Sequence, residues 1–438
     1  MTTPTLLITP RRAALLAPHD NELDVLVRVQ APQAPAELPK RQPLHLALVI
    51  DRSGSMAGQP LEQAKRCAEF VLDGLLPTDR LSVVAYDDEA QTLVPAVELR
   101  DKDAVRRAIR QIDEGGRTNL HGGWLQGAET LAPHTHDRLT SRVILLSDGC
   151  ANRGITEHDP IYAQCAELAR AGVTTSTYGL GRSFNEELMI GMARHGLGSS
   201  YYGQTAEDLM DPFREEFALL NALCARRLHL AVTPAPGVSV KMLNDYGTAG
   251  TDAWLLPDLA FGGEAWAVVR LRVPSGSGAA ADPIALAAFS VRYTTLDGEP
   301  RTIPLQSLAL PALPASAFNA IAEDELVARR AGELEVARLQ GAARTAAQQG
   351  DWSAVDVALR RAERFAATNP WVAAALEELR ALAARKDDVM FAKESAYSAR
   401  RMSSRLAAHS EQAILFDAAP SAPYLRRKAN QGKTDGRP

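Results

Sequence analysis

Near its start the chain reads Leu44-His-Leu-Ala-Leu-Val-Ile-Asp-Arg-Ser-Gly-Ser55. The first seven residues of this stretch are almost all apolar, as is typical of a central parallel strand that is covered on both faces. Apolar residues at helical spacing follow from about Pro60 to Leu76, and the pattern stops at Pro77. A buried strand, a short polar turn and a helix in this order predict one repeat of a parallel α/β sheet.

The same alternation of strand and helix continues to about residue 220. Further strands are predicted at 81–86, 90–97, 142–146, 173–178 and 201–202, and helices at 101–112, 121–132, 158–171, 185–195 and 206–221. The first two of these strands bracket the turn Asp87-Asp88-Glu89, which indicates a hairpin. Strands separated by helices of this length predict a doubly wound, mainly parallel, Rossmann-like sheet over residues 42–221.

The segments on either side of this domain have a different pattern. Leu23, Val25, Val27 and Val29 alternate with polar neighbours, and similar strand-like stretches recur between residues 227 and 310. Two N-terminal strands alone would be only marginally stable, so we expect them to pair with strands after residue 226. Residues 1–41 and 222–312 are therefore predicted to form one split β-sandwich domain, into which the α/β domain is inserted.

The composition changes again after about residue 313. Ala, Glu, Arg and Leu dominate and β-branched residues are few, which predicts a small α-helical domain over residues 313–409. Gly350-Asp351 and Asn369-Pro370 divide it into about three helices. The last residues, 410–438, are rich in Pro, Ala and basic residues, and we expect them to form a mobile basic tail.

The composition of the chain argues for some classes of protein and against others. The 438 residues are 46% hydrophobic and 23% charged, as in a globular protein of several domains, and the net charge of −5 does not favour a nucleic-acid binder. The four cysteines form no CxxC pair, which argues against a zinc site and a disulfide framework. Without a signal-peptide pattern or a run of about 20 apolar residues, we expect a cytoplasmic protein that does not cross a membrane. The oligomeric state stays open.

Oxygen-bearing side chains lie in three of the predicted loops. Asp51, Ser53 and Ser55 come directly after the first strand, Thr118 lies in a Gly-rich loop before a helix, and Asp148 ends a later strand. The carboxyl ends of parallel strands are where open α/β sheets bind ligands. Carboxylates and hydroxyls suit a hard cation such as Mg²⁺, which prefers oxygen ligands and keeps several waters. The first three residues alone would equally suit a helix cap and a turn.

This set of five residues, in this order and on these strand ends, resembles the metal-ion-dependent adhesion site of von Willebrand factor type A domains. The run Asp148-Gly-Cys-Ala-Asn-Arg-Gly154 is similar to a stretch common in bacterial members of that family. Arg117 departs from the Gly-Gly-Thr-Asn sequence usual in those members, although Thr118 and Asn119 stay in register. The resemblance covers residues 42–220, and the flanking sandwich resembles that of inter-α-trypsin-inhibitor-heavy-chain-like proteins.

The resemblance implies a role for each residue of the set. Ser53, Ser55 and Thr118 would be hydroxyl ligands of Mg²⁺ (or Mn²⁺ or Ca²⁺), whereas Asp51 and Asp148 would act largely through water. Few direct carboxylates leave the cation under-neutralised, so a protein partner would supply an Asp or Glu as a further ligand. The protein would then act as an adaptor or scaffold. The candidates for the rim of this site are Asn119, His121, Asn152 and Arg153.

Two other functions remain open from the sequence. The first is a metal-dependent hydrolase or phosphatase, since a bound metal can activate water. Phosphotransferases that use an aspartate after the first strand carry a second acid two residues later, where this chain has Ser53, so we expect no enzyme activity. The second is a scaffold whose helical region binds the partner while the metal face is idle.

Overall fold

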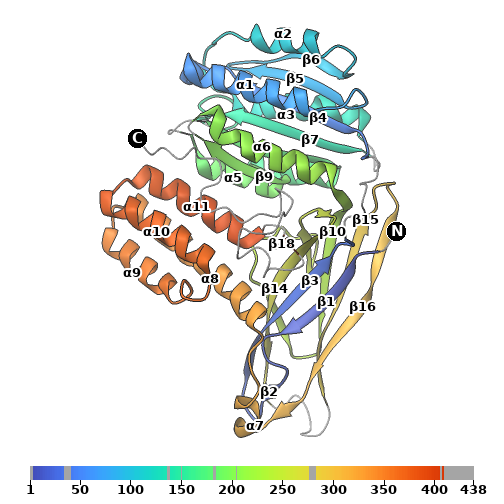
Figure 1. Ribbon diagram of the computed structural model, residues 1–438, viewed down its shortest axis with the longest axis vertical. Coiled ribbons are helices and arrows are strands. Elements are labelled where there is room, and N and C mark those ends of the chain that lie inside the picture. Colours follow the sequence, from blue (N-terminus) through green and yellow to red (C-terminus); the bar gives the residue numbers. More distant parts are fainter. Residues whose placement is uncertain are drawn as a thin grey trace. The chain divides into compact units, whose positions relative to one another are not determined.

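The computed structural model describes residues 3–33, 41–135, 139–148, 150–180, 184–203, 205–275, 283–404 and 407–408 (Figure 1). The described parts of residues 40–221 form one compact unit, and those of residues 1–39 and 222–429 form a second. The tail predicted over 410–438 lies outside the described residues. Among the helices that are described, none has both the length and the apolar character needed to cross a membrane.

The first unit is built on a six-stranded sheet with the strand order β6-β5-β4-β7-β8-β9. Neighbouring strands are parallel except β5 and β6, which form the antiparallel hairpin predicted around residue 88. The strands are β4 (Leu44–Asp51), β5 (Arg80–Tyr86), β6 (Ala90–Glu98), β7 (Thr140–Ser147), β8 (Val173–Leu180) and β9 (Leu197–Gly203). Every residue of β4 and of β7 is buried, as expected of central strands covered on both faces.

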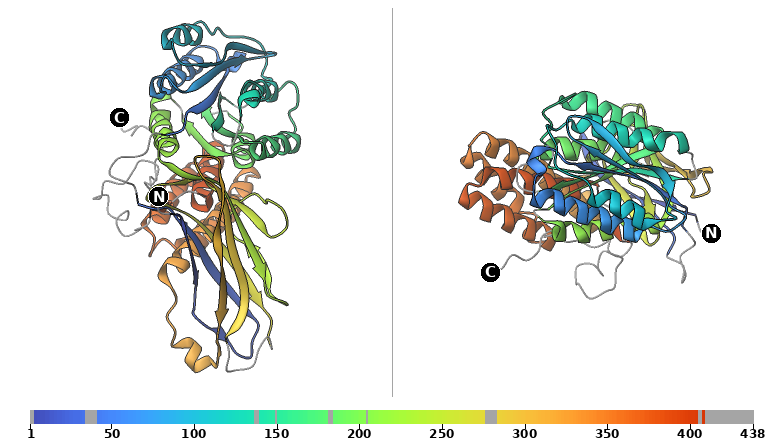
Figure 2. Two further views of the ribbon diagram at one scale, coloured as in Figure 1. Left: turned by 90° about the vertical axis from the view of Figure 1, so that its right-hand side faces the viewer. Right: turned by 90° about the horizontal axis from the view of Figure 1, so that it is seen from above.

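Helices cover both faces of this sheet (Figure 2). α1 (Gln59–Gly74), α2 (Lys102–Arg110) and α6 (Ala206–Asn221) lie on one face, and α3 (Leu120–Leu131), α4 (His158–Arg170) and α5 (Glu186–His195) lie on the other. α3 packs closely on β4 because Gly127 has no side chain, and a Cβ at this position would lie 2.3 Å from Val49. The predicted doubly wound α/β sheet is thereby confirmed.

The second unit contains two antiparallel sheets. One has the order β1-β3-β14-β11, with β18 paired to β14, and the other has the order β12-β10-β15-β16, with β13 paired to β10. The strands are β1 (Thr5–Pro10), β3 (Asn21–Gln30), β10 (Leu223–Pro234), β11 (Ser239–Met242), β12 (Ala253–Leu256), β13 (Leu259–Ala260), β14 (Gly263–Val273), β15 (Ile284–Thr294), β16 (Pro300–Leu310) and β18 (Ala407–Ala408). β3 pairs with β14 along its whole length, so strands from before and after the α/β unit share one sheet. A short parallel pair, β2 (Leu15–Leu16) and β17 (Ala312–Leu313), joins the same two parts of the chain.

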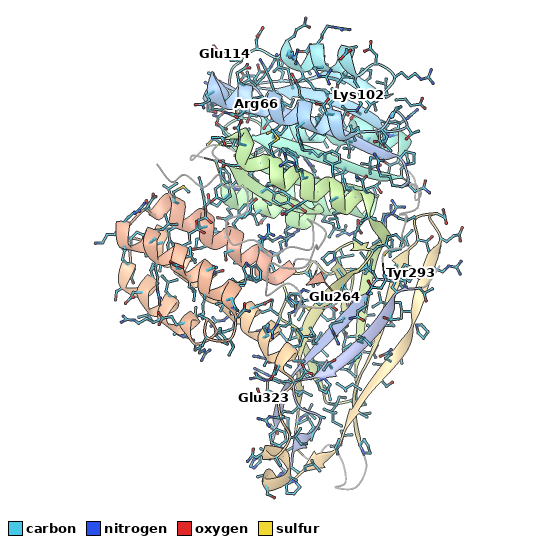
Figure 3. The ribbon with its side chains drawn as sticks, in the orientation of Figure 1. Arg66, Lys102, Glu114, Glu264, Tyr293 and Glu323 are labelled. Atoms are coloured by element: carbon cyan, nitrogen blue, oxygen red, sulfur yellow. The ribbon has the colours of Figure 1, made fainter. Side chains whose placement is uncertain are left out.

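The described part of the second unit also contains five helices, of which α8 packs on the first sheet. They are α7 (Ala315–Asn319), α8 (Glu325–Gln348), α9 (Trp352–Glu363), α10 (Pro370–Arg385) and α11 (Asp388–Ser404). Val327 and Leu334 of α8 form one apolar cluster with Leu26 of β3 and Trp266 of β14. Just before α8, Glu323 (labelled in Figure 3) forms an ion pair of 2.8 Å with Arg11.

The helical region is divided more often than predicted. Besides the breaks at Asp351 and Asn369, α10 ends at Lys386, which adopts a left-handed conformation with a φ of 53°. Such a conformation is usual for glycine and uncommon for lysine, so the sequence pattern did not predict this break. Asp387 then accepts a hydrogen bond of 3.1 Å from the backbone of Met390 in the first turn of α11.

Candidate metal centre

Three loops meet at the carboxyl edge of the α/β sheet. They follow β4, precede α3 and follow β7, and backbone hydrogen bonds tie them together. The Gly54 N–H donates to the Gly116 carbonyl at 2.8 Å, and the Gly115 N–H donates to the Arg52 carbonyl at 2.7 Å. The Asn152 N–H donates to the Thr118 carbonyl at 3.1 Å. The loops that carry the five predicted ligands therefore form one hydrogen-bonded assembly.

The Asp51 carboxylate lies at the centre of this assembly. It is completely buried, and its Oδ1 accepts from the Ser53 N–H at 2.9 Å. Its Oδ2 accepts from the hydroxyls of Ser147, at 2.6 Å, and Tyr86, at 3.1 Å. Burial and the nearby Asp148 carboxylate raise the pKa of Asp51 to about 6, although the hydrogen bonds from Ser147 and Ser53 oppose this shift.

The three predicted hydroxyl ligands are held by these loops. The Oγ atoms of Ser53 and Ser55 are 3.2 Å apart. In an octahedral Mg²⁺ site with bonds of about 2.1 Å, adjacent ligand oxygens are about 3.0 Å apart, so this separation suits two neighbouring positions. Thr118 is 1% exposed, and its backbone N–H donates to the Asn152 side chain at 2.9 Å.

The charges of the site fit a divalent cation. Asp51 and Asp148 are both buried, and in the described part of the chain neither forms an ion pair with a basic side chain. Two buried carboxylates close to each other are costly unless a positive charge compensates them. The donors are carboxylate and hydroxyl oxygens, which suit Mg²⁺, Mn²⁺ or Ca²⁺. The described residues contain no group of three His, Cys, Asp or Glu side chains placed to hold a metal.

Two aspartates that the sequence assigned only to a hairpin turn shape the loop of Thr118. The Asp88 carboxylate accepts from the Arg117 N–H at 3.0 Å, and the Asp87 carboxylate accepts from the Gly116 N–H at 3.4 Å. A Cβ at Gly115 would lie 1.9 Å from Oδ2 of Asp87, and a Cβ at Gly116 would lie 1.9 Å from Oδ2 of Asp88. The two glycines therefore let the loop close onto the turn.

The four rim candidates have different surroundings. The His121 side chain is buried and hydrogen-bonded to Gln164 at 2.6 Å, which favours a packing role. The Asn119 side chain caps α3 by accepting from the Gly122 N–H at 3.0 Å. The Asn152 side chain is bonded to the backbone of Thr118, as described above. Arg153 is half exposed and lies 3.3 Å from Asp88, so it is the rim candidate whose side chain is most available to a partner.

The α/β unit is similar in sequence to known proteins. Residues 45–214 match the von Willebrand factor type A domain family. The uncharacterized protein sll0103 of Synechocystis sp. is 31% identical over 201 residues, which are 45% of this chain and 46% of that protein. Inter-alpha-trypsin inhibitor heavy chain H3 of Homo sapiens is 32% identical over 200 residues, which are 43% of this chain and 22% of that protein. The chain thus spans less than half the length of these relatives.

Two solved structures are similar over most of the chain. The von Willebrand factor type A protein from Catenulispora acidiphila has a TM-score of 0.69 at 15% identity and covers 90% of this chain and 96% of its own. The ArnB paralog VWA2 from Sulfolobus acidocaldarius has a TM-score of 0.63 at 18% identity and covers 92% and 99%. At these identities the likeness concerns the fold alone. Together with the family match, it identifies residues 45–214 of this chain as a von Willebrand factor type A domain.

Proposed function

We propose that Asp51, Ser53, Ser55, Thr118 and Asp148 hold one divalent cation, Mg²⁺ or else Mn²⁺ or Ca²⁺, through which the domain binds an Asp or Glu of a protein partner. Domains of this family generally mediate metal-dependent protein–protein interactions. The observation that carries the proposal is the uncompensated pair of buried carboxylates beside hydroxyl groups on loops that are bonded together. The protein as a whole would act as an adaptor or scaffold.

Each residue has a distinct task in this proposal. Tyr86 and Ser147 orient the Asp51 carboxylate, which in turn fixes the backbone of Ser53. Thr118 contributes a neutral oxygen from a separate loop, so the site is complete only when the loops are in contact. When bound, the cation supplies an open coordination position for a carboxylate oxygen of the partner. Neutral hydroxyl ligands leave the positive charge only partly compensated, which favours an anionic partner group.

The surroundings of the site favour binding over hydrolysis. A metal-dependent hydrolase needs a general base within hydrogen-bond reach of the attacking water. His121 is the histidine closest in sequence to Thr118, and its side chain is buried and bonded to Gln164. Tyr86 donates its hydroxyl proton to Asp51. These side chains have positioning and packing roles, and we therefore propose an interaction module that is not an enzyme.

Partner capture in the presence and absence of metal tests the proposal. The whole 438-residue chain on beads should retain a partner in Mg²⁺ and release it in EDTA. Thr118→Ala removes one buried hydroxyl without a change in charge, so it should abolish capture while the protein stays folded. Thr78→Ala is the matched control, because Thr78 is exposed and precedes β5 at the opposite edge of the sheet. Substituting the partner's acidic residues in turn should identify one whose loss has the same effect as EDTA.

Capture that persists in EDTA, or in Thr118→Ala, would contradict the proposal. It would move the binding surface away from the metal face, and the helices of the second unit would then be the next region to test.

A further inference from the structure

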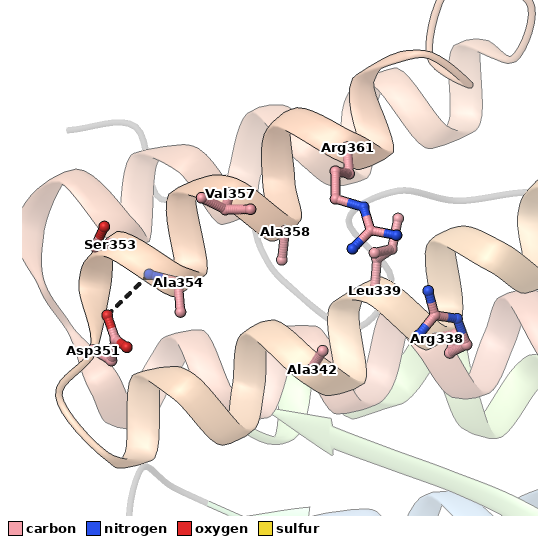
Figure 4. Close-up of a pocket in the computed structure, with 9 residues that line it drawn as sticks. All are labelled: Arg338, Leu339, Ala342, Asp351, Ser353, Ala354, Val357, Ala358 and Arg361. Atoms are coloured by element: carbon pink, nitrogen blue, oxygen red, sulfur yellow. Dashed lines mark hydrogen bonds between the residues drawn. The ribbon is translucent and has the colours of Figure 1, made fainter.

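A groove lies between α8 and α9, in the unit that does not contain the proposed metal site (Figure 4). Its volume is about 460 Å³, which is within the range of about 300–1,000 Å³ found for ligand pockets in proteins. Leu339 and Ala342 of α8 and Val357 of α9 contribute apolar surface. Val357 is 50% exposed although its side chain is large and apolar. The groove thus offers apolar surface that a ligand could cover.

Guanidinium groups gather at one end of this groove. Arg338 and Arg361 come from different helices and point into the same end (Figure 4). Glu335 accepts two hydrogen bonds from Arg338, at 2.8 and 2.9 Å, and lies 3.9 Å from Arg364. Three positive groups therefore surround one carboxylate, and the hydrogen bonds from Arg338 followed by the charges of Arg364 and Arg361 lower its pKa. Among the described residues, Arg361 has no ion-pair partner.

Helix stability accounts for part of this arrangement, because Arg338 and Glu335 form an i,i+3 ion pair on α8. Basic residues in the last turn of a helix stabilise its dipole, and Arg360 and Arg361 occupy that turn of α9. Arg338 lies in the interior of α8, where this effect is small because the dipole acts within the last turn. Its guanidinium nevertheless lies at the same end of the groove as that of Arg361. The local excess of positive charge beside an apolar floor is complementary to a segment that is both acidic and apolar.

We propose that this groove binds an extended segment of a partner protein in which an apolar side chain is followed closely by Asp or Glu. From Ser353 to Arg361 the groove runs along nine residues of α9, and the eight steps between them span about 12 Å at 1.5 Å per residue. An extended chain rises about 3.3 Å per residue, so about four residues fit. The apolar side chain covers Val357, and the carboxylate lies between Arg338 and Arg361. This second binding site is independent of the metal and gives the protein two separate docking surfaces.

Peptide selection in EDTA tests this proposal without a contribution from the metal site. A random seven-residue peptide library displayed on phage is selected on the whole 438-residue chain, and the enriched sequences are made as fluorescent peptides. We expect Asp or Glu next to an apolar residue in these sequences. The double variant Arg338→Glu, Arg361→Glu should weaken binding by about tenfold or more, because each attraction becomes a repulsion. Val357→Asp should weaken binding as well.

The matched control is Arg385→Glu, a charge reversal at an exposed arginine in the last turn of α10. It should leave the affinity unchanged, and thermal melting should show that all variants are folded. Failure to enrich any sequence, enrichment without acidic residues, or equal binding by the double variant would overturn the proposal. So would a change in molar mass of the double variant in light scattering, because it would show that a second copy of the chain occupies the groove.

Discussion

Replacing Arg330 by methionine should destabilise the second unit strongly. The Arg330 side chain is fully buried on α8, with its guanidinium 4.2 Å from the centre of the Trp266 ring. It forms ion pairs with Glu333, at 3.2 Å, and with Glu264 of β14, at 3.8 Å. Both carboxylates are buried as well, with exposures of 0% and 1%. The arginine therefore compensates two acidic groups at the contact between the helix and the sheet.

The expected decrease in unfolding free energy comes from the Glu333 and Glu264 carboxylates, which remain buried after the arginine charge is removed. Methionine keeps an apolar stem of similar length and removes the charge. Breaking a buried ion pair by removing one partner costs about 3–5 kcal/mol, because the other charge remains buried without compensation. The remaining hydrogen bonds from Asn369 to Glu333 and from Gln30 to Glu264, together with the ion pair of 3.8 Å between Arg28 and Glu264, limit the loss to that range. For a unit of about 150–250 residues, this corresponds to a decrease in Tm of about 6–20 °C.

Urea unfolding followed by circular dichroism measures this effect. Arg338→Met is the matched control, since it removes an arginine from the same helix whose ion pair with Glu335 is exposed to solvent. Such pairs contribute about 0–1 kcal/mol. Adding Glu264→Gln and Glu333→Gln to Arg330→Met should restore part of the stability, because two buried negative charges are then removed. A loss from Arg330→Met that is no larger than that of the control would refute this reasoning.

Two further predictions concern the domain boundaries and the Thr118 loop. Deleting residues 1–33 removes β3, which pairs with β14 from Glu264 to Val273, so the second unit should aggregate or melt at lower temperature. A fragment of residues 41–221 should instead melt as it does within the full chain. An unchanged melting profile after the deletion would show that the boundaries are wrong. Gly115→Ala should weaken Mn²⁺ binding by about tenfold, because the Cβ of the alanine would displace Asp87. Asp87 is not a proposed ligand, but it holds the loop that carries Thr118. Gly341→Ala, with open space around the added methyl group, should leave Mn²⁺ binding unchanged and raise the unfolding free energy by about 0.5–1 kcal/mol.

Much of the fold was predictable because the relevant signals are local. The apolar run before Asp51 and the helical spacing after it predict a buried parallel strand and its helix, and both are present. The pairs Gly350-Asp351 and Asn369-Pro370 predict where α9 and α10 begin, and the structure has both helix starts there. The break at Lys386 was not predictable in this way, since it depends on a lysine in a conformation that its type seldom adopts.

The candidate site was predictable only in part. Asp-x-Ser-x-Ser, the Gly-rich loop of Thr118 and the strand end at Asp148 mark the proposed ligands because a cation requires oxygen atoms, which few residue types provide. The groups that orient them act through tertiary contacts that local patterns do not show. Tyr86 and Ser147 carried one usable signal, since each ends a strand adjacent to β4, and Tyr86 lies opposite Asp51 in the parallel register. Asp87 and Asp88 follow β5 at the same edge. A hairpin turn already accounts for acidic residues at these positions, so the sequence pattern did not indicate their contact with the Thr118 loop.

Calorimetric titration with Mn²⁺ tests the proposed metal site most directly. We expect the wild-type protein and Thr78→Ala to bind one Mn²⁺ per chain with the same affinity. Thr118→Ala and Ser53→Ala should each bind at least about tenfold more weakly, because a hard cation loses one oxygen of its shell. Both variants should melt close to the wild-type temperature in EDTA. Equal Mn²⁺ binding by wild type and Thr118→Ala, or no binding by the wild type at millimolar Mn²⁺, would contradict the assignment of these residues as metal ligands.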